Sequence, residues 1–177
     1  MKHCLLSAQG ANRAGLVAEI SGLLHGAQVN IMDSSMTTLR GEFVMMLLLE
    51  IPETTSLEHL QAQGETIAGL RLYWQTLSPE EALGPAQPEQ PSHAISVIGP
   101  DQTGLVHQIS TILAARQLNI CNVETRLLSQ GSSPRYAMVL EIQAPEAHIE
   151  DLQTALTKAG QQLGVDIHLH PLLFAEI

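Results

Sequence analysis

An internal duplication constrains the fold of this chain more than any other feature. The segment Gly10-x-x-x-x-Gly15-Leu16-Val17 recurs, 89 residues later, as Gly99-x-x-x-x-Gly104-Leu105-Val106. The same offset relates Ile20-Ser21 to Ile109-Ser110, Leu24 to Leu113, Gln28 to Gln117, and Asn30-Ile31 to Asn119-Ile120. A constant offset over this span is hard to obtain by chance. Its period is too long for a solenoid, so the sequence predicts two copies of one domain.

A proline-rich segment separates the two copies. Residues 78–92, SPEEALGPAQPEQPS, contain four prolines and almost no large apolar side chain. Because proline removes backbone donors and favours extended conformations, we expect a semi-stiff linker rather than a packed element. The sequence therefore predicts a first domain over residues 1–77, a linker over 78–92 and a second domain over 93–177.

Each copy begins with the same hydrophobic patterns. Strand-like apolar runs near residues 3–9 and 93–98 end at a glycine, and a helical periodicity follows them. The apolar positions of this first helix are Leu16, Val17, Ile20, Leu23 and Leu24, and in the second copy Leu105, Val106, Ile109, Ile112 and Leu113. We expect these positions to form one buried helix face.

The rest of each copy also follows one order. A second strand opens at Asn30 or Asn119, and turns follow at Arg40-Gly41 and at Gln130–Pro134. The third strand covers residues 43–51 and 136–142, and the last strand runs near 71–77 and 165–170. Between them lies a second helix with apolar positions Leu57, Leu60, Ile67 and Leu70, or Ile149, Leu152, Leu156 and Leu163. The order βαββαβ predicts an α+β fold of two ferredoxin-like domains, each a four-stranded antiparallel sheet with two helices on one face.

The third strand is more apolar than a sheet with one wet face requires. Residues 43–49, FVMMLLL, do not alternate between apolar and polar side chains, and residues 136–140, YAMVL, alternate little. Both faces of this strand are therefore expected to be buried. At ~25 cal/mol per Å2, leaving the extra aliphatic side chains in water would forgo several kcal/mol. We expect the second face to pack on another sheet or to join a larger one, within the chain or in a dimer.

The charge balance restricts the partners of the chain. With 8 Lys+Arg against 18 Asp+Glu, the formal net charge is −10, whereas binding to a nucleic-acid backbone needs clustered basic residues. We expect no direct contact with nucleic acid. The N-terminus lacks a signal-peptide pattern, and the longest apolar run, residues 43–49, is far below the ~18 residues of a membrane-spanning helix. These features predict a soluble cytoplasmic protein without membrane contact.

The sequence lacks the motifs of catalysis and cofactor binding. It contains no Gly-x-Ser-x-Gly, no Gly-Lys-Ser/Thr phosphate loop and no Gly-x-Gly-x-x-Gly, so we expect no enzyme activity, no catalytic residue and no cofactor. Cys4 and Cys121 lie in apolar stretches and are expected to be small buried hydrophobes. His168 and His170 would point to one side of a strand, as metal ligands can. Two polar residues on the wet side of an end strand are the simpler interpretation, and no metal site is predicted.

The loop between the first strand and the first helix contains the first part of a candidate site. In the two copies it consists of Asn12, Arg13, Ala14 and Gly15 before Leu16, and of Asp101, Gln102, Thr103 and Gly104 before Leu105. Free N–H groups at a helix start, with the macrodipole behind them, favour a small carboxylate. Glycine also lets a ligand approach the backbone closely. Asn12 and Asp101 are equally suited to cap the helix, and this structural interpretation stays open.

The start of the second strand contains the other part of the candidate site. Asn30 and Asn119 are expected to lie beside the glycine turn, where an amide can bind the ammonium or the carboxylate of a zwitterion. Asp33 and Asn122 follow three residues later. They are suited to hold an ammonium group or simply to end a turn.

These motifs resemble those of the ACT domain family, small βαββαβ modules that bind amino acids. The family's signature is a strand ending in glycine, then Asp-Arg-Pro-Gly-Leu/Ile-Val, an apolar helix and an Asn-Ile strand start. It stands here as Asn12-Arg13-Ala14-Gly15-Leu16-Val17 with Asn30-Ile31, and as Asp101-Gln102-Thr103-Gly104-Leu105-Val106 with Asn119-Ile120. The first copy lacks the Asp and Pro of the signature, and the second lacks the Arg and Pro. The resemblance covers nearly the whole chain.

A pair of ACT domains with no attached enzyme is most similar to the glycine cleavage system transcriptional repressor group. This resemblance implies a regulator that senses a small amino acid, glycine or a similar one, and restrains a DNA-bound activator through protein contact. A homodimer is expected. The ligand-binding residues that the motifs and the resemblance indicate are Asn12, Arg13, Ala14, Gly15, Leu16, Asn30, Ile31 and Asp33 in the first copy, and Asp101, Gln102, Thr103, Gly104, Leu105, Asn119, Ile120 and Asn122 in the second.

Two other functions stay open at this point. The chain is also suited to be a purely structural module, whose sheet faces build an oligomer and whose turns bind no ligand. It is equally suited to be a regulatory part of a separate metabolic enzyme, such as a folate-dependent hydrolase or a dehydrogenase, and that enzyme would then be its protein partner.

Overall fold

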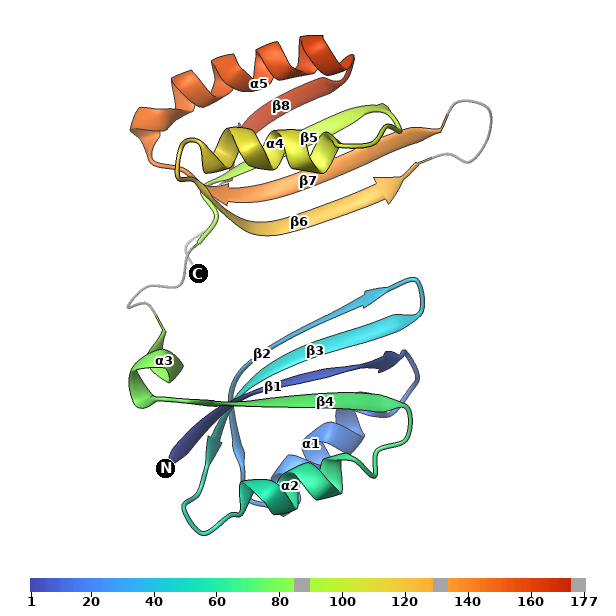
Figure 1. The fold of residues 1–177 in the computed structure, drawn as a ribbon, viewed down its shortest axis with the longest axis vertical. Helices are drawn as coiled ribbons and strands as arrows, with labels where there is room; N and C mark the ends of the chain where they lie inside the picture. The colour runs from blue at the N-terminus through green and yellow to red at the C-terminus, as the bar shows by residue number, and fades with distance from the viewer. Residues whose placement is uncertain (85–89, 129–133, 173–177) are drawn as a thin grey trace. The chain divides into compact units, whose positions relative to one another are not determined.

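The computed structural model describes residues 1–84, 90–128 and 134–172 and divides the chain into two compact units, Met1–Gln87 and Pro88–Ile177 (Figure 1). The first unit contains β1 (Lys2–Ala11), α1 (Leu16–Gly26), β2 (Asn30–Leu39), β3 (Glu42–Ile51), α2 (Leu57–Gly64), β4 (Leu70–Leu77) and α3 (Pro79–Leu83). The second contains β5 (His93–Pro100), α4 (Leu105–Ala114), β6 (Asn119–Leu127), β7 (Arg135–Gln143), the 3-10 helix η1 (Glu146–His148), α5 (Ile149–Leu163) and β8 (Asp166–Pro171).

Both units have the predicted ferredoxin-like topology. The strand order is β2-β3-β1-β4 in the first sheet and β6-β7-β5-β8 in the second. All six pairings are antiparallel. In each unit the two long helices lie on the same face of the sheet (Figure 1). The prediction of two βαββαβ domains is therefore confirmed.

The core of each unit lies between the sheet and its helices. Alternate residues of β1 and β3 are buried there, beginning with Cys4 on β1 and Phe43 on β3. From α1, Leu16, Ile20 and Leu24 complete this layer, because positions four residues apart share one side of a helix. The second unit repeats the arrangement with Leu105, Ile109 and Leu113 of α4. Burial confirms the prediction for Cys4 and raises the pKa of its thiol.

Parts of the helix prediction are wrong. Val17 and Val106 are exposed although both were assigned to the buried face. In the first unit α2 ends at Gly64, so Ile67 lies beyond it and Leu70 begins β4. A side chain at Gly64 would come within 2.6 Å of Leu72 Cδ1, so the helix end and the last strand are in close contact. The longer α5 keeps all four predicted apolar positions.

The proline-rich segment contains one packed element. Residues 79–83 form α3, which contacts β1 and β4 and buries Ala82. A capping box explains its start: Ser78 Oγ accepts from Glu81 N–H, and Glu81 Oε2 accepts from Ser78 N–H at 2.7 Å. The expectation of an unpacked linker is therefore wrong for this part. The predicted turn at Arg40-Gly41 joins β2 to β3, whereas most of the turn predicted at Gln130–Pro134 lies outside the described residues.

The sheet face opposite the two long helices is called the outer face below. Among the described residues, α3 contacts β1 and β4 of the first sheet, while outer residues of β3 remain exposed. On β3, Val44 and Met46 point to this face and are exposed, while their neighbours Met45 and Leu47 are buried. The expectation that both faces of this strand are buried is therefore not met inside a unit. The apolar outer residues still require a physical explanation, because they leave hydrophobic surface in water.

Candidate functional site

The glycine turn links β1 to α1 in the first unit and β5 to α4 in the second. Gly15 and Gly104 stand at the N-cap positions with φ of 94° and 92°, a conformation that favours glycine. No described side chain caps either helix, so the proposed capping roles of Asn12 and Asp101 are wrong. Their backbone N–H groups instead donate to Gly41 and Pro134, which ties each turn to the neighbouring β-hairpin.

In the first unit an ion pair lies over this turn. Arg13 and Glu19 form a bidentate pair, with Arg13 Nη2 donating to Glu19 Oε2 at 2.7 Å. Arg13 Nη2 also donates to the carbonyl of Ala68 at 3.3 Å. A Cβ added to Gly15 would lie 3.6 Å from Glu19 Oε1, so this carboxylate sits at the start of α1. The hydrogen bond from Arg13 favours the ionised form of the Glu19 carboxyl and lowers its pKa.

A groove of about 550 Å3 opens beside the first turn. Of the predicted residues, Asn12, Arg13, Gly15 and Leu16 line it. Val17 and Ser21 of α1, Met36 of β2 and Phe43 of β3 line it as well. Its size lies within the range of small-molecule sites. The groove therefore brings together four of the eight residues predicted for this unit.

In the second unit neutral amides replace the ion pair. The offset of 89 places Gln102 at the position of Arg13 and Gln108 at that of Glu19. Gln102 Nε2 donates to the carbonyl of Leu163 at 2.8 Å. A Cβ added to Gly104 would lie 3.7 Å from Gln108 Nε2. The second turn thus presents the same backbone with a side-chain amide, rather than a carboxylate, at the start of the helix.

Asn30 and Asn119 open their strands as predicted but lie far from the glycine turns. Asn30 pairs with Glu50, whereas the end of β1 at Gly10 pairs with Phe43 and, through it, with Thr38. The eight residue steps from Asn30 to Thr38 span about 26 Å of strand. In the second unit the equivalent strand pairings place Asn119 and Gly99 at opposite ends of the sheet. The expectation that these asparagines lie beside the turns of their own units is therefore wrong.

The residues after these asparagines form a bulge in both units. The register of β2 on β3 shifts between Ile31 and Asp33, and that of β6 on β7 shifts between Ile120 and Asn122. Asp33 Oδ1 accepts from the N–H of Ser34 at 2.7 Å. Asp33 and Asn122 thus lie within strands beside a bulge, and neither ends a turn.

Glu19, Gln108 and Met36 lie at the turns but are not among the predicted site residues. Glu19 and Gln108 follow their glycines by four residues, and this spacing places a helical side chain over the start of its helix. That spacing was therefore a usable signal. The approach of Met36 to the first turn depends on the pairing of β2 with β3, which the sequence does not specify by itself.

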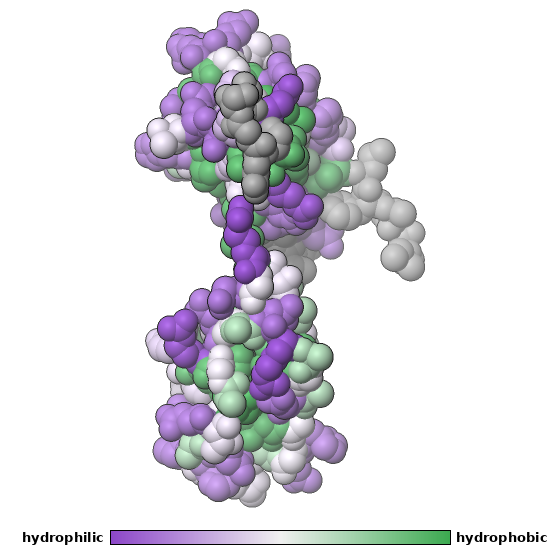
Figure 2. Space-filling model, turned by 90° about the vertical axis from the view of Figure 1, so that its right-hand side faces the viewer, coloured by the Kyte–Doolittle hydropathy of each residue, from purple (hydrophilic) through white to green (hydrophobic). Residues whose placement is uncertain are grey.

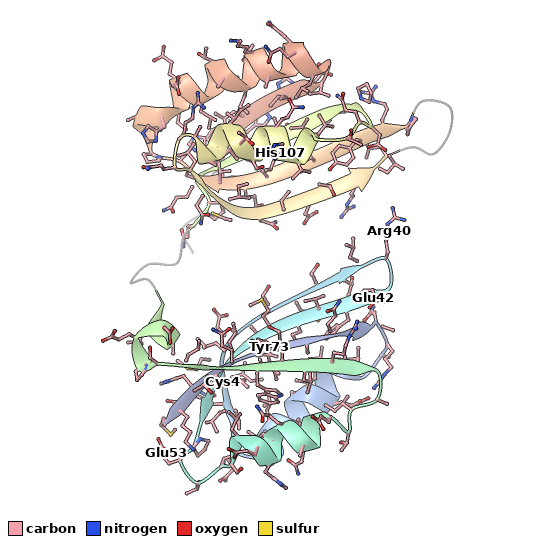
Figure 3. The ribbon with its side chains drawn as sticks, viewed as in Figure 1. Cys4, Arg40, Glu42, Glu53, Tyr73 and His107 are labelled. Carbon is pink, nitrogen blue, oxygen red and sulfur yellow. The ribbon has the colours of Figure 1, made fainter. Side chains whose placement is uncertain are left out.

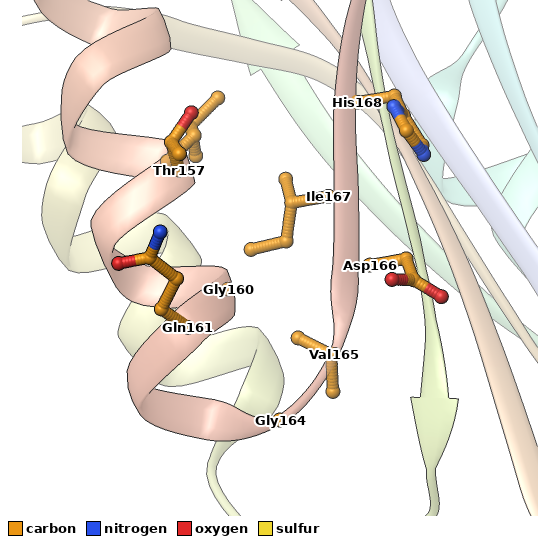
Figure 4. Close-up of a pocket in the computed structure, with 9 residues that line it drawn as sticks. Thr157, Gly160, Gln161, Gly164, Val165, Asp166, Ile167 and His168 are labelled. Atoms are coloured by element: carbon orange, nitrogen blue, oxygen red, sulfur yellow. The ribbon is translucent and has the colours of Figure 1, made fainter.

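Other hollows lie away from the glycine turns. One of about 350 Å3 lies between α5 and β8, where Gly160 leaves room beside the strand (Figure 4). Asn119 lines another, of about 590 Å3, together with Arg116 and His148. His168 and His170 are exposed on an edge strand and their rings stack at 6.0 Å. Among the described residues, no group of three or more His, Cys, Asp or Glu side chains is placed to hold a metal ion.

Comparisons with known proteins agree with this architecture. The model of the ACT domain family matches residues 2–64 and 94–170. One relative, UPF0237 protein MK1213 of Methanopyrus kandleri, is 36% identical over 75 residues, which cover 41% of this chain and 79% of that protein. UPF0237 protein MJ1558 of Methanocaldococcus jannaschii is 33% identical over the same length and the same shares of both chains.

Two solved structures share the fold of the whole chain. A structure of an unknown protein from Galdieria sulphuraria matches with a TM-score of 0.79 and 24% identity, over 97% of this chain and 99% of that one. A structure of a "putative glycine cleavage system transcriptional repressor" matches with a TM-score of 0.65 and 19% identity, over 98% of both chains.

In the described part of the chain, every helix is too short or too polar to cross a bilayer. The match of the family model spans most of both units. The chain therefore belongs to the ACT domain family, a family of regulatory domains that generally bind amino-acid effectors and oligomerise.

Proposed function

We propose that this chain is a non-catalytic cytoplasmic regulator that binds a small amino acid at its glycine turns and reports it through protein contacts. Glycine is the proposed effector, and a DNA-bound activator of glycine cleavage is the proposed partner. The likeness of the whole chain to a "putative glycine cleavage system transcriptional repressor" supports this choice. The formal charge of −10 favours a regulator that binds a protein rather than DNA.

The observation that carries the proposal is the repeated glycine turn without a side-chain cap. In both units the helix start keeps its backbone N–H groups free of a described capping side chain. A helix start of this kind favours an anion such as the carboxylate of an amino acid. Asp101 in the second turn supplies a carboxylate of its own for the ammonium group.

The second turn is the proposed primary site. At the first turn the Glu19 carboxylate lies close to Gly15, and Arg13 is bound to it. A ligand carboxylate there would be repelled by this negative charge. Gln108 presents no such competing charge at the second turn. Asn30 and Asn119 reach a bound ligand only if a second domain brings the start of its strand alongside a turn.

The size of the ligand limits its affinity. Glycine has five heavy atoms, and at a ceiling of ~1.5 kcal/mol per atom the gain is at most about 7 kcal/mol. The dissociation constant should therefore be about 10 μM or weaker, which suits a sensor of metabolite concentration. To regulate a partner, the ligand must also favour one arrangement of the protein over another by about 1–3 kcal/mol.

Titration calorimetry with a panel of free amino acids at millimolar concentration tests the proposal. We expect heat from glycine or another small amino acid, and no heat from acetate or methylamine, which each lack one of the two charged groups. The variant Gly104→Ala should weaken binding, because its Cβ forces the turn out of the required φ. Absence of heat from every amino acid would remove the ligand from the proposal.

The structural module without a ligand remains the second candidate for the first unit. The pair of Arg13 and Glu19 favours it there, because each charge is already satisfied within the chain. In that case Gly15→Ala would change stability and leave the calorimetric response to amino acids unchanged.

A further inference from the structure

One side-chain hydrogen bond is present in both units although different residues make it. In the first unit Arg13 Nη2 donates to the carbonyl of Ala68 at 3.3 Å, and in the second Gln102 Nε2 donates to the carbonyl of Leu163 at 2.8 Å. The offset of 89 relates Gln102 to Arg13. This contact, called the tether below, therefore starts from the same position of each glycine turn.

The tether also ends at equivalent positions. Gly10 pairs with Leu70, and the register of β5 on β8 places Val165 opposite Gly99. The accepting carbonyl lies two residues before this strand partner in both units. The tether thus joins the same two loops in each unit, the glycine turn and the segment between the second long helix and the last strand.

These two loops lie at one end of each sheet. In the first unit Arg40 and Glu42 mark this end in Figure 3, because Glu42 pairs with Ala11 at the end of β1, whereas Glu53 marks the opposite end. Figure 2 looks onto this end of the first unit, where hydrophilic and hydrophobic residues both reach the surface. The side chains that form the tether are exposed in both units, so a dissolved ligand can reach them.

The two tethers differ in how many of their donors are in use. Arg13 donates to Glu19 through both of its terminal nitrogens, and Nη2 donates to Ala68 as well. Gln102 has two N–H groups on Nε2, and within the described residues only the carbonyl of Leu163 accepts from them. One N–H of Gln102 is therefore available to a ligand at the second turn.

The Leu163 carbonyl lies at the junction of α5 and β8, formed by residues 163–166. Leu163 is the last residue of α5, where carbonyls lack partners within the helix. Gly164 follows with φ of 65°, and Val165 N–H donates back to the carbonyl of Gly160 at 3.1 Å. The same junction borders the hollow between α5 and β8 in Figure 4. A change at the junction therefore alters a surface that another protein can contact.

We propose that Gln102 couples a ligand at the second turn to the junction of α5 and β8, by donating one N–H to the Leu163 carbonyl and the other to the carboxylate of the ligand. The coupling rests on the function proposed above, in which a small amino acid binds at Gly104. Because the bond to Leu163 already fixes the Gln102 side chain, its second N–H meets the ligand without a further loss of rotamer freedom. The bound ligand in turn holds the side chain against Leu163.

The tether of the first unit does not depend on a ligand. Glu19 holds the Arg13 guanidinium whether or not the first turn is occupied. The second tether is neutral, so a ligand changes its strength. Coupling is reciprocal, so the factor by which the closed junction strengthens ligand binding equals the factor by which saturating ligand suppresses opening of the junction.

Amide hydrogen exchange of the isotope-labelled full chain, followed by NMR with and without 20 mM glycine, tests this coupling. The Val165 amide reports on the junction of the second unit, and the Leu70 amide reports on its counterpart in the first unit. We expect glycine to slow exchange at Val165 about threefold to tenfold and to leave exchange at Leu70 unchanged.

Three variants identify the residue that carries the coupling. Gln102→Ala should weaken glycine binding about threefold to tenfold and abolish the response of Val165. Gln102→Arg, which copies the first unit, should restore both. Asp151→Ala is the matched control, because it removes the bond from Arg116 Nε to Asp151 at 2.7 Å, near the start of α5 instead of its end. It should leave the glycine affinity and the response of Val165 unchanged, and circular dichroism checks that all three variants are folded.

The outcomes separate the coupling from the proposed function. A wild-type chain in which no amide shifts with glycine would refute the proposed function, and the coupling with it. Glycine binding without slower exchange at Val165, or a Gln102→Ala variant that responds as the wild type does, would overturn the coupling alone. A folded Gln102→Arg variant that binds glycine without a response at Val165, or loss of the response in Asp151→Ala, would overturn it equally.

Discussion

The two units share a backbone and differ in the charges placed on it. At the first glycine turn Arg13 and Glu19 satisfy each other, and at the second turn Gln102 and Gln108 are neutral. On the outer sheet faces the charges are distributed the other way round. The centre of the first face is uncharged, whereas the second face carries ionisable groups. After duplication, the glycines that fix the backbone remained, while the solvent-facing side chains changed. The proposed primary ligand site is therefore the turn of the second unit, where Gln108 replaces the carboxylate of Glu19.

The largest expected effect concerns the glycine that ends the first strand of each unit. A Cβ on Gly10 would lie 2.1 Å from the backbone oxygen of Gly69, whereas a Cβ on Gly99 would meet Val165 Cγ1 at 2.4 Å. A backbone atom cannot yield as a side chain can. We expect Gly10→Ala to destabilise the first unit by about 3 kcal/mol and Gly99→Ala to cost the second about 1–2 kcal/mol.

Urea denaturation can separate these two effects. Trp74 is the single tryptophan of the chain and packs against the core of the first unit, so its fluorescence reports on that unit. Gly10→Ala should strongly lower the urea midpoint of the Trp74 fluorescence transition. Gly99→Ala should leave that midpoint unchanged and lower only the midpoint of the circular dichroism transition of the second unit. Adding Val165→Ala to Gly99→Ala should recover part of the stability that the second unit loses. Equal losses in both units would refute the distinction between backbone and side-chain contact.

Next in size is the substitution of the turn glycines. Gly15→Ala and Gly104→Ala force alanine to adopt φ near 94° and 92°. We expect each to cost about 1–2 kcal/mol, nearly equally in the two units. The fluorescence and circular dichroism transitions in urea measure the two values. A clear inequality would mean that the two turns are held differently despite their matching angles.

Exchange of the charged residues should move ligand affinity from one turn to the other. Glu19→Gln removes the carboxylate at the first helix start, and Gln108→Glu installs one at the second. In Glu19→Gln we expect glycine to bind the first turn roughly threefold to tenfold more tightly. In Gln108→Glu we expect glycine to bind the second turn more weakly by a similar factor. Site-resolved NMR titration measures both, and unchanged affinities would exclude competition by Glu19.

The same pair predicts a pH dependence. Because the pKa of Glu19 is lowered in the folded chain, the pairing is complete above the ordinary carboxyl range and is lost as the pH falls through the lowered value. The variant Arg13→Gln removes the cause of the shift. Its Glu19 carboxyl should therefore titrate at a higher pH than in the wild type, as NMR of the carboxyl carbon would reveal. An unchanged midpoint would show that Arg13 does not hold Glu19 in solution.

The smallest expected effects come from the residues that follow the first helix of each unit. Gln28 and Gln117, equivalent by the offset of 89, have φ of 58° and 56°. Glycine adopts this conformation without the Cβ penalty. Gln28→Gly and Gln117→Gly should each stabilise their unit by about 0.5 kcal/mol, measured as higher urea midpoints. A loss of stability in either unit would mean that the glutamine side chain contributes more than its backbone strain costs.

Much of the fold could be predicted from the sequence because the duplication tests each pattern twice. Leu16, Ile20 and Leu24 recur as Leu105, Ile109 and Leu113, and all six are buried. The hydrophobic pattern gave wrong predictions where the burial or secondary structure of a residue depends on its neighbours in space. Val17 continues the apolar run yet lies past the edge of the buried face, and Leu70 matches a helical spacing but starts β4.

The candidate site was predicted only in part, for a topological reason. The turn residues Asn12, Arg13 and Gly15 are adjacent in sequence and so meet at one groove. Asn30 follows them closely in sequence as well, but α1 carries the chain back along the sheet, so β2 begins at the opposite end. Sequence proximity therefore misplaced Asn30 by most of a strand length.

The most direct test of the account is an NMR titration of the uniformly labelled full chain with glycine up to about 20 mM. The amides of Gly15 and Gly104 report separately on the two turns. The account predicts that the Gly104 amide shifts at lower glycine concentration than the Gly15 amide, with alanine and serine as comparison ligands. No shift of either amide with any of the three amino acids would contradict it.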